Sequence, residues 1–560
     1  MQSILNRIYG PLRGAEALGR ISALMEGFSI NAPPAQDKFF TETDAILISY
    51  GDTLLSPGQP PLQTLRGFAE KYFKDIFSTL HILPFFPFSS DDGFSVTDFF
   101  AVRSDLGSWP DIAALARDFK LMVDLVANHI SAQSQWFADY LEEKHGFREL
   151  AIEVDPSEDL SSVTRPRPWP LLTPYDKPSG RRVHLWTTFS ADQIDLNYRS
   201  LDVLEHMVRV LLFYVAHGAG LIRLDAIAYL WKQIGTACIH LPQTHDMVRL
   251  FRKILDHLAP HVMLVTETNV PHPENISYFG DGQDEAQMVY NFTLGPLLLH
   301  ALTTGSTSEL RQWAGSLKPM STRTTFMNFT ASHDGIGVRP LEGILSASQI
   351  QSLVDRAKQN GGAVSEKQNS DGSTSPYELN ITYLDALKDP NESEDPFHIQ
   401  RFLISQAAAL ALPGVPAVYI HSLLGSRNWA EGVRQTGRAR TINRQQMDAN
   451  EIGQQLEEEQ TFRSQIFYPY LEMLRVRGRQ PAFHPLAAMQ VLHLDDRVLA
   501  IKRHCPRQTI FALFNFSADQ LSLTLPGTEE KMVWTDLLSG RSFNPPPAVE
   551  LKAYQILWLA

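Results

Sequence analysis

Residues 219–228 read AGLIRLDAIA, a short apolar run that ends at the acidic residue Asp225. The run contains one charged residue, Arg223, two positions before Asp225. Side chains two residues apart on a β-strand point to the same face, and a nearby cation favours the ionised form of a carboxyl group. This stretch therefore predicts a strand whose C-terminal end carries an ionised carboxylate, which is the state that a nucleophile needs.

Runs of the same kind recur along the chain and are separated by stretches with helical periodicity. The eight runs are Ile46–Tyr50, Leu80–Leu83, Leu121–Val126, Leu221–Leu224, Val262–Thr266, Met288–Tyr290, Thr325–Phe329 and Val415–Ile420, of which the sixth is the weakest. Apolar runs that alternate with helices are typical of parallel βαβ units. Eight such units predict an α/β protein with a closed (β/α)8 barrel, the TIM barrel.

The remaining segments predict additions to this barrel. Two intervals are too long for simple crossovers: one is rich in proline and aromatic residues, and the other is polar and rich in glycine. Short alternating runs near the C-terminus, such as TIFALFNFS, indicate antiparallel strands. The predicted organisation is a helical extension at 1–44, barrel segments at 45–134, 201–339 and 401–482, an inserted subdomain after the third strand at 135–200, a loop-rich insertion after the seventh strand at 340–400, and a C-terminal antiparallel β domain at 483–560.

The composition disfavours several classes of protein. The chain has 560 residues, with 44% hydrophobic and 20% charged residues, close to the average for globular proteins. Its net charge of −13 disfavours nucleic-acid binding, because an acidic surface repels phosphate backbones. The two cysteines, Cys238 and Cys505, predict no disulfide framework and no metal site. With no signal peptide and no apolar span of ~18–20 residues, we expect a cytoplasmic protein that does not bind membranes.

The polar residues that close the apolar runs predict the chemistry, because barrel enzymes carry out catalysis at the C-terminal ends of their strands. Asp225 ends the fourth run, Glu267 follows the fifth, and Asp334 follows the seventh. Two carboxyl groups about 5–5.5 Å apart can cleave a glycosidic bond with retention, one as nucleophile and the other as general acid and base. His129 and His333 add polar groups at two further strand ends.

Each of these residues has a structural explanation when taken alone. A strand-end aspartate is often a helix N-cap, and a strand-end glutamate is often a solvated charge. His129 alone is typical of a structural histidine, and Arg223 with Asp225 is consistent with a structural salt bridge. The four polar strand ends taken together favour a catalytic site.

Four motifs resemble the signature regions of the α-amylase superfamily, glycoside hydrolase family 13. They are VDLVANHIS at 123–131, GLIRLDAIAYLWK at 220–232, VTETN at 265–269 and ASHDGIG at 331–337. The resemblance covers nearly the whole chain after residue 45. HILPFFPFSSDDGF at 81–94 and TINR at 441–444 resemble the sucrose-phosphorylase branch, and SSVTRPR at 161–167 and ETNVPHPENISYFG at 267–280 are most similar to glucosylglycerate phosphorylases.

The resemblance implies a role for each site residue. It implies that Asp225 is the nucleophile, Glu267 the acid and base, and Asp334 the stabiliser of the transition state. The residues implied to bind the glucosyl unit are Asp91, Phe94, His129, Arg223, His333 and Arg440, of which Asp91 and Arg440 would close the pocket at the 4-hydroxyl. The residues implied to bind phosphate or the acceptor are Arg167, Tyr377 and Glu378. No cofactor and no metal is implied.

Arg167 also has a simpler explanation, since together with Arg165 it is typical of a solubilising loop pair. Glu378 stands where sucrose phosphorylases usually have glutamine, which weakens fructose as the natural acceptor. An anionic acceptor such as glycerate needs a further cation, and Lys232, Arg339 and Arg427 are open candidates.

The function expected from the resemblance is that of a retaining disaccharide phosphorylase of the hexosyltransferase class. Its expected partners are a small α-glucoside, with glucosylglycerate favoured, and inorganic phosphate, and its product is α-glucose 1-phosphate. The alternatives are phosphorylases of sucrose, sucrose 6′-phosphate or glucosylglycerol, an α-glucosidase or transglucosidase, and an inactive binding scaffold. We expect a monomer or a homodimer.

Overall fold

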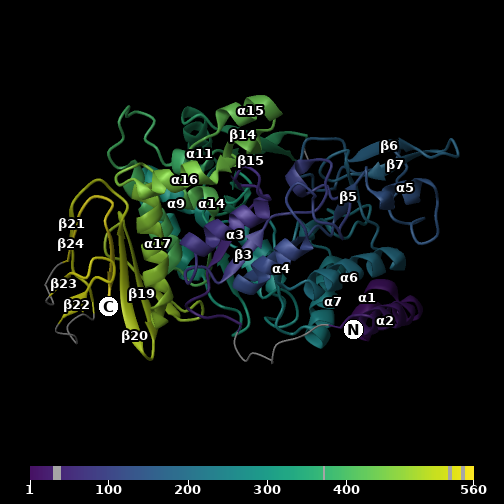
Figure 1. Cartoon of the computed structure of the whole chain (residues 1–560), viewed down its shortest axis with the longest axis horizontal. Coiled ribbons are helices and arrows are strands. Elements are labelled where there is room, and N and C mark those ends of the chain that lie inside the picture. Colours follow the sequence, from purple (N-terminus) through teal and green to yellow (C-terminus); the bar gives the residue numbers. More distant parts are fainter. Residues whose placement is uncertain (30–38, 370–371, 527–532, 544–548) are drawn as a thin grey trace.

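The computed structural model describes residues 1–29, 39–369, 372–526, 533–543 and 549–560, and a closed barrel of parallel strands lies at its centre (Figure 1). The barrel strands are β1 (Ile46–Ser49), β3 (Thr79–Ile82), β4 (Lys120–Leu125), β9 (Ala219–Leu224), β10 (Met263–Thr266), β11 (Met288–Tyr290), β12 (Thr325–Asn328) and β16 (Val415–Tyr419). Each predicted run overlaps one of these strands, and β1 closes the barrel by pairing with both β3 and β16. The predicted (β/α)8 barrel is therefore confirmed.

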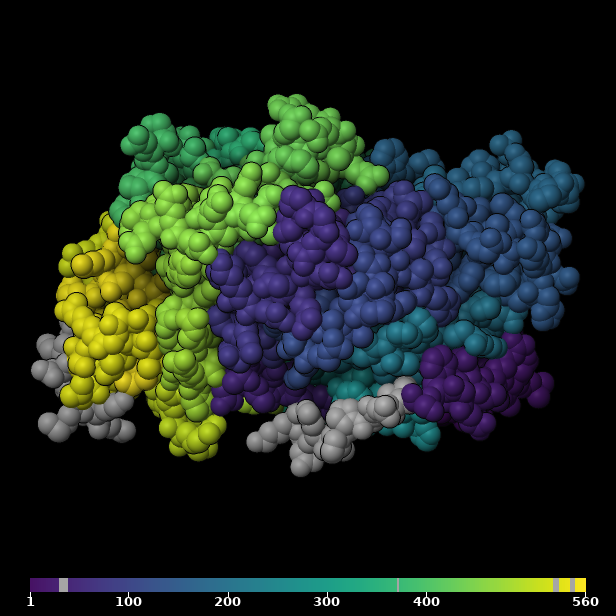
Figure 2. Space-filling view, viewed as in Figure 1, coloured from purple at the N-terminus to yellow at the C-terminus, as the bar shows by residue number. Residues whose placement is uncertain are grey.

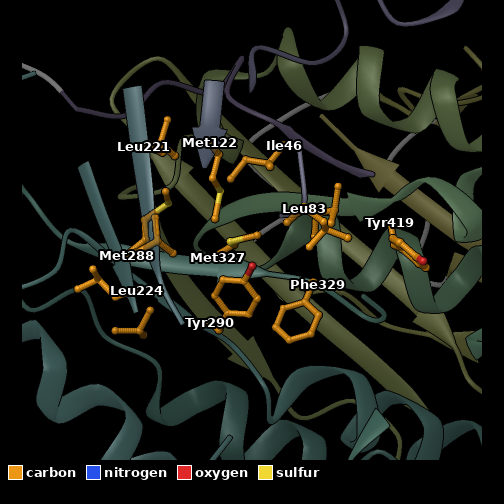
Figure 3. Close-up of a cluster of buried hydrophobic side chains, with 14 of the residues drawn as sticks. Ile46, Leu83, Met122, Leu221, Leu224, Met288, Tyr290, Met327, Phe329 and Tyr419 are labelled. Atoms are coloured by element: carbon orange, nitrogen blue, oxygen red, sulfur yellow. The ribbon is translucent and has the colours of Figure 1, made fainter. Parts of the chain in front are cut away.

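Apolar side chains fill the space inside and around these strands. Met122, Leu221, Met288 and Met327 come from four different strands and gather in one buried cluster (Figure 3). Parallel strands are covered on both faces, so their sequences are almost continuously apolar. The main helices beside the barrel are α3 (Pro61–Tyr72), α4 (Trp109–Asp118), α6 (Leu201–Ala216), α7 (Pro242–Leu258), α9 (Leu294–Thr304), α10 (Ser308–Ser316), α13 (His398–Ala411) and α17 (Ser464–Gly478).

The segment after β4 forms small sheets and contributes Val154, Val163, Leu171 and Trp186 to a separate small hydrophobic cluster. Strand β5 (His129–Ser131) pairs with β8 (Gln193–Asp195), and β6 (Leu172–Asp176) pairs with β7 (Arg182–Trp186). A short helix, α5 (Gln135–Leu141), lies in the same segment.

The segment after β12 contains more regular structure than its polar sequence predicts. It holds helix α11 (Ala347–Gln359) and a three-stranded sheet of β13 (Ile336–Gly337), β15 (Thr374–Asn380) and β14 (Ala363–Gln368). A capping box at Ser346 starts the helix, and Leu353, Val354 and Ala357 form its buried face. Arg165 forms an isolated bridge with Gln368, which brings the two inserted segments together.

An antiparallel sheet forms the C-terminal part of the chain, as predicted. Strands β18 (Ala488–Leu492), β19 (Val498–Cys505), β20 (Gln508–Asn515) and β25 (Ile556–Leu559) pair in this order. Two small pairs, β21 (Leu521–Leu523) with β24 (Val549–Leu551) and β22 (Trp534–Thr535) with β23 (Ser542–Phe543), accompany it. The other short elements are β2 (Leu54–Leu55), β17 (Met447–Asp448), α8 (His272–Ile276), α12 (Tyr383–Ala386), α14 (Ile420–Leu423), α15 (Ala430–Thr436) and α16 (Ala449–Glu457).

Two helices precede the barrel, α1 (Gln2–Tyr9) and α2 (Pro11–Glu26). They lie beside α6 and α7, at the end of the molecule away from the C-terminal sheet (Figure 1). In the described part of the chain, none of the helices combines the length and the apolar character that crossing a bilayer requires.

Candidate active site

A cavity opens where the C-terminal ends of the barrel strands meet, and both inserted segments contribute to its walls. The residues that border it include Asp91, Phe94, His129, Arg167, Gln193, Asp225, Tyr229, Glu267, Asn269, His333, Asp334, Tyr377 and Arg440. Every predicted site residue except Arg223 and Glu378 therefore borders one space. Arg223 and Glu378 are buried behind the wall.

Asp225 is held by a buried charge network across three neighbouring strands. Arg223 donates to Asp225 Oδ1 at 2.8 Å and also to Asp124 of β4. Asp124 in turn accepts a hydrogen bond from His81 Nε2 of β3 at 2.8 Å. Burial favours neutral carboxyl groups, yet Arg223 and His81 hold the pKa of Asp124 below its ordinary value. The network therefore fixes the guanidinium that orients Asp225.

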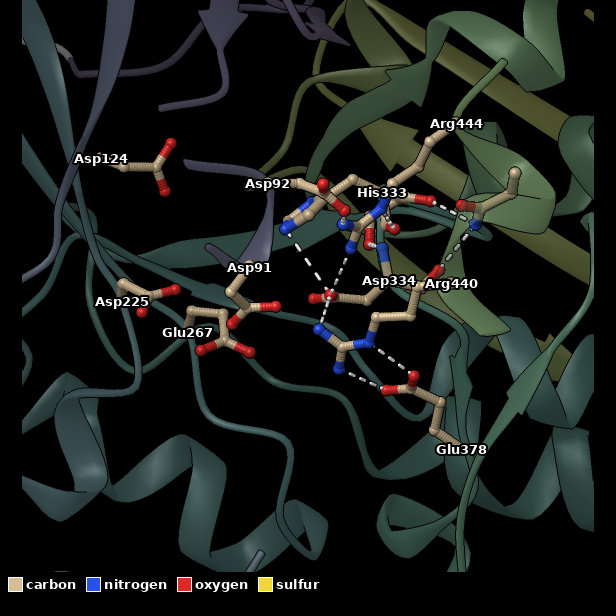
Figure 4. Close-up of polar contacts among 12 residues, drawn as sticks. Asp91, Asp92, Asp124, Asp225, Glu267, His333, Asp334, Glu378, Arg440 and Arg444 are labelled. Atoms are coloured by element: carbon tan, nitrogen blue, oxygen red, sulfur yellow. Dashed lines mark hydrogen bonds and ion pairs between the residues drawn. The ribbon is translucent and has the colours of Figure 1, made fainter. Parts of the chain in front are cut away.

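Glu267 follows β10 and faces the same space as Asp225 (Figure 4). Its Oε2 accepts a hydrogen bond from the backbone N–H of Ala226 at 3.0 Å, and Arg223 Nη2 lies 3.9 Å away. Ala226 is the residue after Asp225, so this hydrogen bond holds the Glu267 carboxyl group close to Asp225.

Burial raises the pKa of Asp225 and that of Glu267, each to about 7. Arg223 opposes this effect at both groups. Repulsion from Asp124 and Asp334 adds to it at Asp225, and repulsion from Asp225 and Asp334 adds to it at Glu267. Arg223 bonds directly to Asp225 and lies farther from Glu267. The arrangement therefore favours an ionised Asp225 beside a protonated Glu267 near neutral pH, and this pair of states suits a nucleophile and a general acid.

Asp334 lies among three basic side chains (Figure 4). Its Oδ1 is 2.5 Å from Arg440 Nη1, 3.5 Å from Arg444 Nη2 and 3.6 Å from His333 Nε2. Burial alone would raise the pKa of this carboxyl group, but Arg440 and Arg444 hold it below its ordinary value. Asp334 is therefore a fixed negative charge at the cavity wall, able to stabilise positive charge that develops on a sugar ring.

Arg440 is held by a bidentate ion pair that the sequence did not predict. Its Nε and Nη2 donate to the two carboxylate oxygens of Glu378, each at 2.7 Å. Glu378 is thus placed behind Arg440 rather than at the cavity surface. Asp91, which the resemblance places with Arg440 at the 4-hydroxyl end of the pocket, borders the same cavity and accepts a hydrogen bond from Gln193 Nε2 at 3.1 Å.

Aromatic and imidazole rings form another part of the wall. The rings of Phe94 and His333 are stacked, with centroids 4.9 Å apart and planes inclined by 8°. His129 Nε2 donates to the backbone carbonyl of Phe94 at 2.8 Å. Burial lowers the pKa of both histidines, so both rings are neutral near pH 7 and can bind hydroxyl groups without adding charge.

Arg167 and Tyr377 border the cavity from the two inserted segments. The guanidinium of Arg167 lies over the Tyr377 ring, 5.6 Å from its centroid. An adjoining cavity of about 430 Å³ shares Arg167, Asp91 and Arg440 with the first, and the exposed side chain of Trp169 lies at its edge. The two cavities therefore adjoin along Asp91, Arg167 and Arg440.

The three candidate cations for an anionic acceptor lie outside the cavity wall. Lys232 is buried and bonded to Asp195 Oδ2 at 2.5 Å and to Asn128 Oδ1 at 2.6 Å. Arg427 is paired with Asp385. Arg339 lies near Tyr229, and its Nη2 is 4.0 Å from Glu274 Oε2.

Several neighbours of the site were not predicted. Asp124 could have been found, because it interrupts the apolar run Leu121–Val126, and Arg444 is the last residue of the TINR motif. Tyr229 lies inside the GLIRLDAIAYLWK motif, whereas Gln193 carries no comparable signal, since only the tertiary fold brings it to the cavity.

The backbone adopts left-handed conformations beside the site. The φ angles are 54° at Asp91, 49° at Asp92 and 48° at Ala226. Such angles cost a residue with a Cβ atom about 1–2 kcal/mol. The ion pair of Asp92 with Arg444 and the hydrogen bond from Ala226 to Glu267 hold these turns in place.

Glu267→Gln is expected to raise the Tm above that of the wild type at about pH 8 and to change it little at about pH 5. The pKa of Glu267 rises from 4.5 to about 7 on folding, so the folded protein binds this proton more tightly than the unfolded chain does. The contribution of this group to stability therefore falls as the pH rises from about 4 to about 7, and glutamine, which resembles the protonated acid, removes that loss. Scanning calorimetry at the two pH values measures the change in Tm. An equal change at both would contradict the raised pKa of Glu267.

Two family models match the chain. Residues 44–335 match the alpha amylase catalytic domain, and residues 489–558 match the maltogenic amylase C-terminal domain. The glucosylglycerate phosphorylase of Allomeiothermus silvanus is 45% identical, and that of Spirochaeta thermophila is 43% identical, each over 100% of this chain and 98% of its own length. The crystal structure of sucrose 6F-phosphate phosphorylase from Thermoanaerobacter thermosaccharolyticum aligns with a TM-score of 0.75 at 24% identity, covering 91% of this chain and 98% of that one.

Proposed function

The chain belongs to the α-amylase family, and from this premise we propose that it is a glucosylglycerate phosphorylase, which transfers a glucosyl unit from glucosylglycerate to inorganic phosphate. The products are α-glucose 1-phosphate and glycerate. Two relatives with this name match the chain from end to end at 43% and 45% identity. The sucrose 6F-phosphate phosphorylase structure, at 24% identity, supports the fold alone. The proposed acceptor rests on the two glucosylglycerate phosphorylases.

The first half of the proposed reaction cleaves the glycosidic bond. A carboxylate oxygen of Asp225 attacks the anomeric carbon, while Glu267 donates its proton to the glycosidic oxygen, so that glycerate leaves and a glucosyl ester forms on Asp225. Asp334 stabilises the positive charge that develops on the ring in the transition state. The ionised Asp225 and the protonated Glu267 described above are the states that this step requires.

In the second half, phosphate takes the place of glycerate. Glu267, now ionised, accepts a proton from phosphate, and a phosphate oxygen attacks the anomeric carbon and releases Asp225. Two successive inversions retain the α configuration. Glu267 is protonated again and ready for the next glucoside.

The observation that carries the phosphorylase proposal is the position of Arg167 at the cavity wall beside Tyr377. Water at about 55 M competes for the same ester, so phosphate must be favoured by placement. A guanidinium suits this task because its planar fork binds two phosphate oxygens at once. Glucose 1-phosphate release from glucosylglycerate should therefore depend on phosphate, and equal release of free glucose with and without phosphate would refute the proposal.

Arg167→Ala is expected to raise the KM for phosphate by about 10²-fold, since a bidentate charged contact contributes roughly 1.5–3 kcal/mol. The variant should also release more free glucose, because water still reaches the ester. Arg167→Lys is the matched variant, since it keeps the charge and loses the fork, and we expect it to fall between alanine and wild type. Separate assays of glucose and glucose 1-phosphate measure the partition, and an unchanged partition in Arg167→Ala would favour a plain glucosidase.

A further inference from the structure

We propose that the N-terminal helix pair α1–α2 is a positioning element of the active site, which acts through Tyr9 to hold the cavity wall at residues 226–232 in the shape that binds the acceptor. The identity of the acceptor, glycerate or phosphate, rests on the proposed function. The contacts that carry the inference do not depend on it.

The helix pair is docked on the barrel by ion pairs. Arg7 of α1 donates to both oxygens of Asp246 in α7, with Nη2 at 2.6 Å from Oδ1 and Nε at 2.9 Å from Oδ2. Arg20 of α2 bonds to Asp202 of α6 at 2.6 Å. Figure 2 shows the helix pair, in purple, seated on the teal surface of the barrel helices. These ion pairs hold α1 against α7 and α2 against α6.

Tyr9, the last residue of α1, contacts two segments that lead to the cavity. Its ring packs edge-on against Trp231, with centroids 6.3 Å apart and an interplanar angle of 62°. Its hydroxyl donates to the backbone carbonyl of Tyr198 at 2.8 Å. Trp231 is buried, and the guanidinium of Arg199 lies 5.3 Å from its ring centroid. Trp231 therefore lies between Tyr9 of α1 and Arg199.

Trp231 belongs to the segment that forms one wall of the cavity. Ala226, Ala228 and Tyr229 of this segment border the cavity directly. Lys232, the residue after Trp231, bonds to Asn128 at 2.6 Å. Asn128 precedes His129, which borders the cavity from another side.

The second contact of Tyr9 leads to the same region. The hydroxyl of Tyr198 donates to the backbone carbonyl of Ala127 at 2.7 Å. Ala127 lies between β4 and His129. The two contacts of one side chain therefore converge on the ends of β4 and β9.

The wall at 226–232 needs such a restraint. It begins at Ala226, whose φ angle of 48° is maintained only by surrounding contacts. Its Tyr229 borders the same cavity as Arg167 and Tyr377, the residues proposed to bind phosphate or the acceptor. Loosening this wall should weaken acceptor binding more than attack by Asp225, which Arg223 orients independently.

Tyr9→Ala tests the proposal, with Tyr9→Phe and Arg20→Ala as matched variants of the full-length protein. Phenylalanine keeps the ring contact with Trp231, and Arg20→Ala removes a docking contact that does not reach the wall. In the synthetic direction, with glucose 1-phosphate and glycerate, Tyr9→Ala should raise the KM for glycerate by about tenfold, which corresponds to about 1.4 kcal/mol. The rate of glucose 1-phosphate hydrolysis without acceptor should change less than about twofold, and Tyr9→Phe should restore most of the affinity.

Hydrogen exchange supplies a readout that is independent of activity. Backbone amides at 226–232 should exchange faster in Tyr9→Ala and as in wild type in Arg20→Ala. Unchanged exchange at this segment, or equal effects of Tyr9→Ala and Arg20→Ala on every measurement, would overturn the inference. A wild-type protein that transfers glucosyl units to neither glycerate nor phosphate would refute the proposed function, and the exchange comparison would still decide whether Tyr9 positions the wall.

Discussion

Asp225→Asn is expected to lower kcat for phosphorolysis by at least about 10⁴-fold, the scale on which the loss of a nucleophile acts. Asparagine has nearly the same shape as aspartate but cannot form the glucosyl ester. The side-chain oxygen of asparagine can still accept the hydrogen bond that Arg223 donates at 2.8 Å, so the geometry of the site should persist while the chemistry is lost. Phosphate-dependent release of glucose 1-phosphate measures the loss.

Two measurements separate a lost nucleophile from a damaged fold. The Tm of Asp225→Asn should equal or exceed that of the wild type at about pH 8, because burial disfavours the ionised carboxyl group that the substitution removes. In the wild type, mass spectrometry of a quenched reaction should find a glucosyl adduct on the peptide that contains Asp225. Activity of the variant within about tenfold of the wild type would exclude double displacement through this residue.

Glu267→Gln is expected to lower kcat by about 10²–10⁴-fold, the usual contribution of general acid and base catalysis. Glutamine keeps the contact with the Ala226 amide but cannot donate a proton to a departing oxygen. The loss should therefore depend on the leaving group. Glucosylglycerate, whose leaving group needs a proton, should react far more slowly, whereas α-glucosyl fluoride, whose fluoride needs little help, should still form the ester.

The matched comparison for this prediction is the formation of the glucosyl ester in the two variants, Glu267→Gln and Asp225→Asn. With α-glucosyl fluoride, Glu267→Gln should accumulate the glucosyl ester on Asp225, and Asp225→Asn should accumulate none. Equal slowing of Glu267→Gln with both donors would assign Glu267 a role in binding rather than in proton transfer.

The barrel and its catalytic carboxyl groups could be predicted because both depend on short distances along the chain. Each barrel strand is three to six residues long, and strand periodicity places Arg223 and Asp225 on one face whatever surrounds them. Parallel closure then brings the strand ends together, so residues that follow different runs, such as Glu267 and Asp334, meet in one space. The regular structure at 340–400 was harder to predict because its polar strands carry little periodic signal.

The barrel and the residues at its strand ends follow from patterns within short stretches of the chain, whereas the pairing of their charges depends on how distant segments fold together. Glu378 holds Arg440, His81 and Asp124 support Arg223, and Tyr9 contacts Trp231, more than two hundred residues away. The physical reason is that periodicity describes neighbours within a few residues, whereas an ion pair or a ring contact between distant segments depends on how the loops and insertions fold over the barrel. The sequence around either residue of such a pair does not indicate which residue will be its partner.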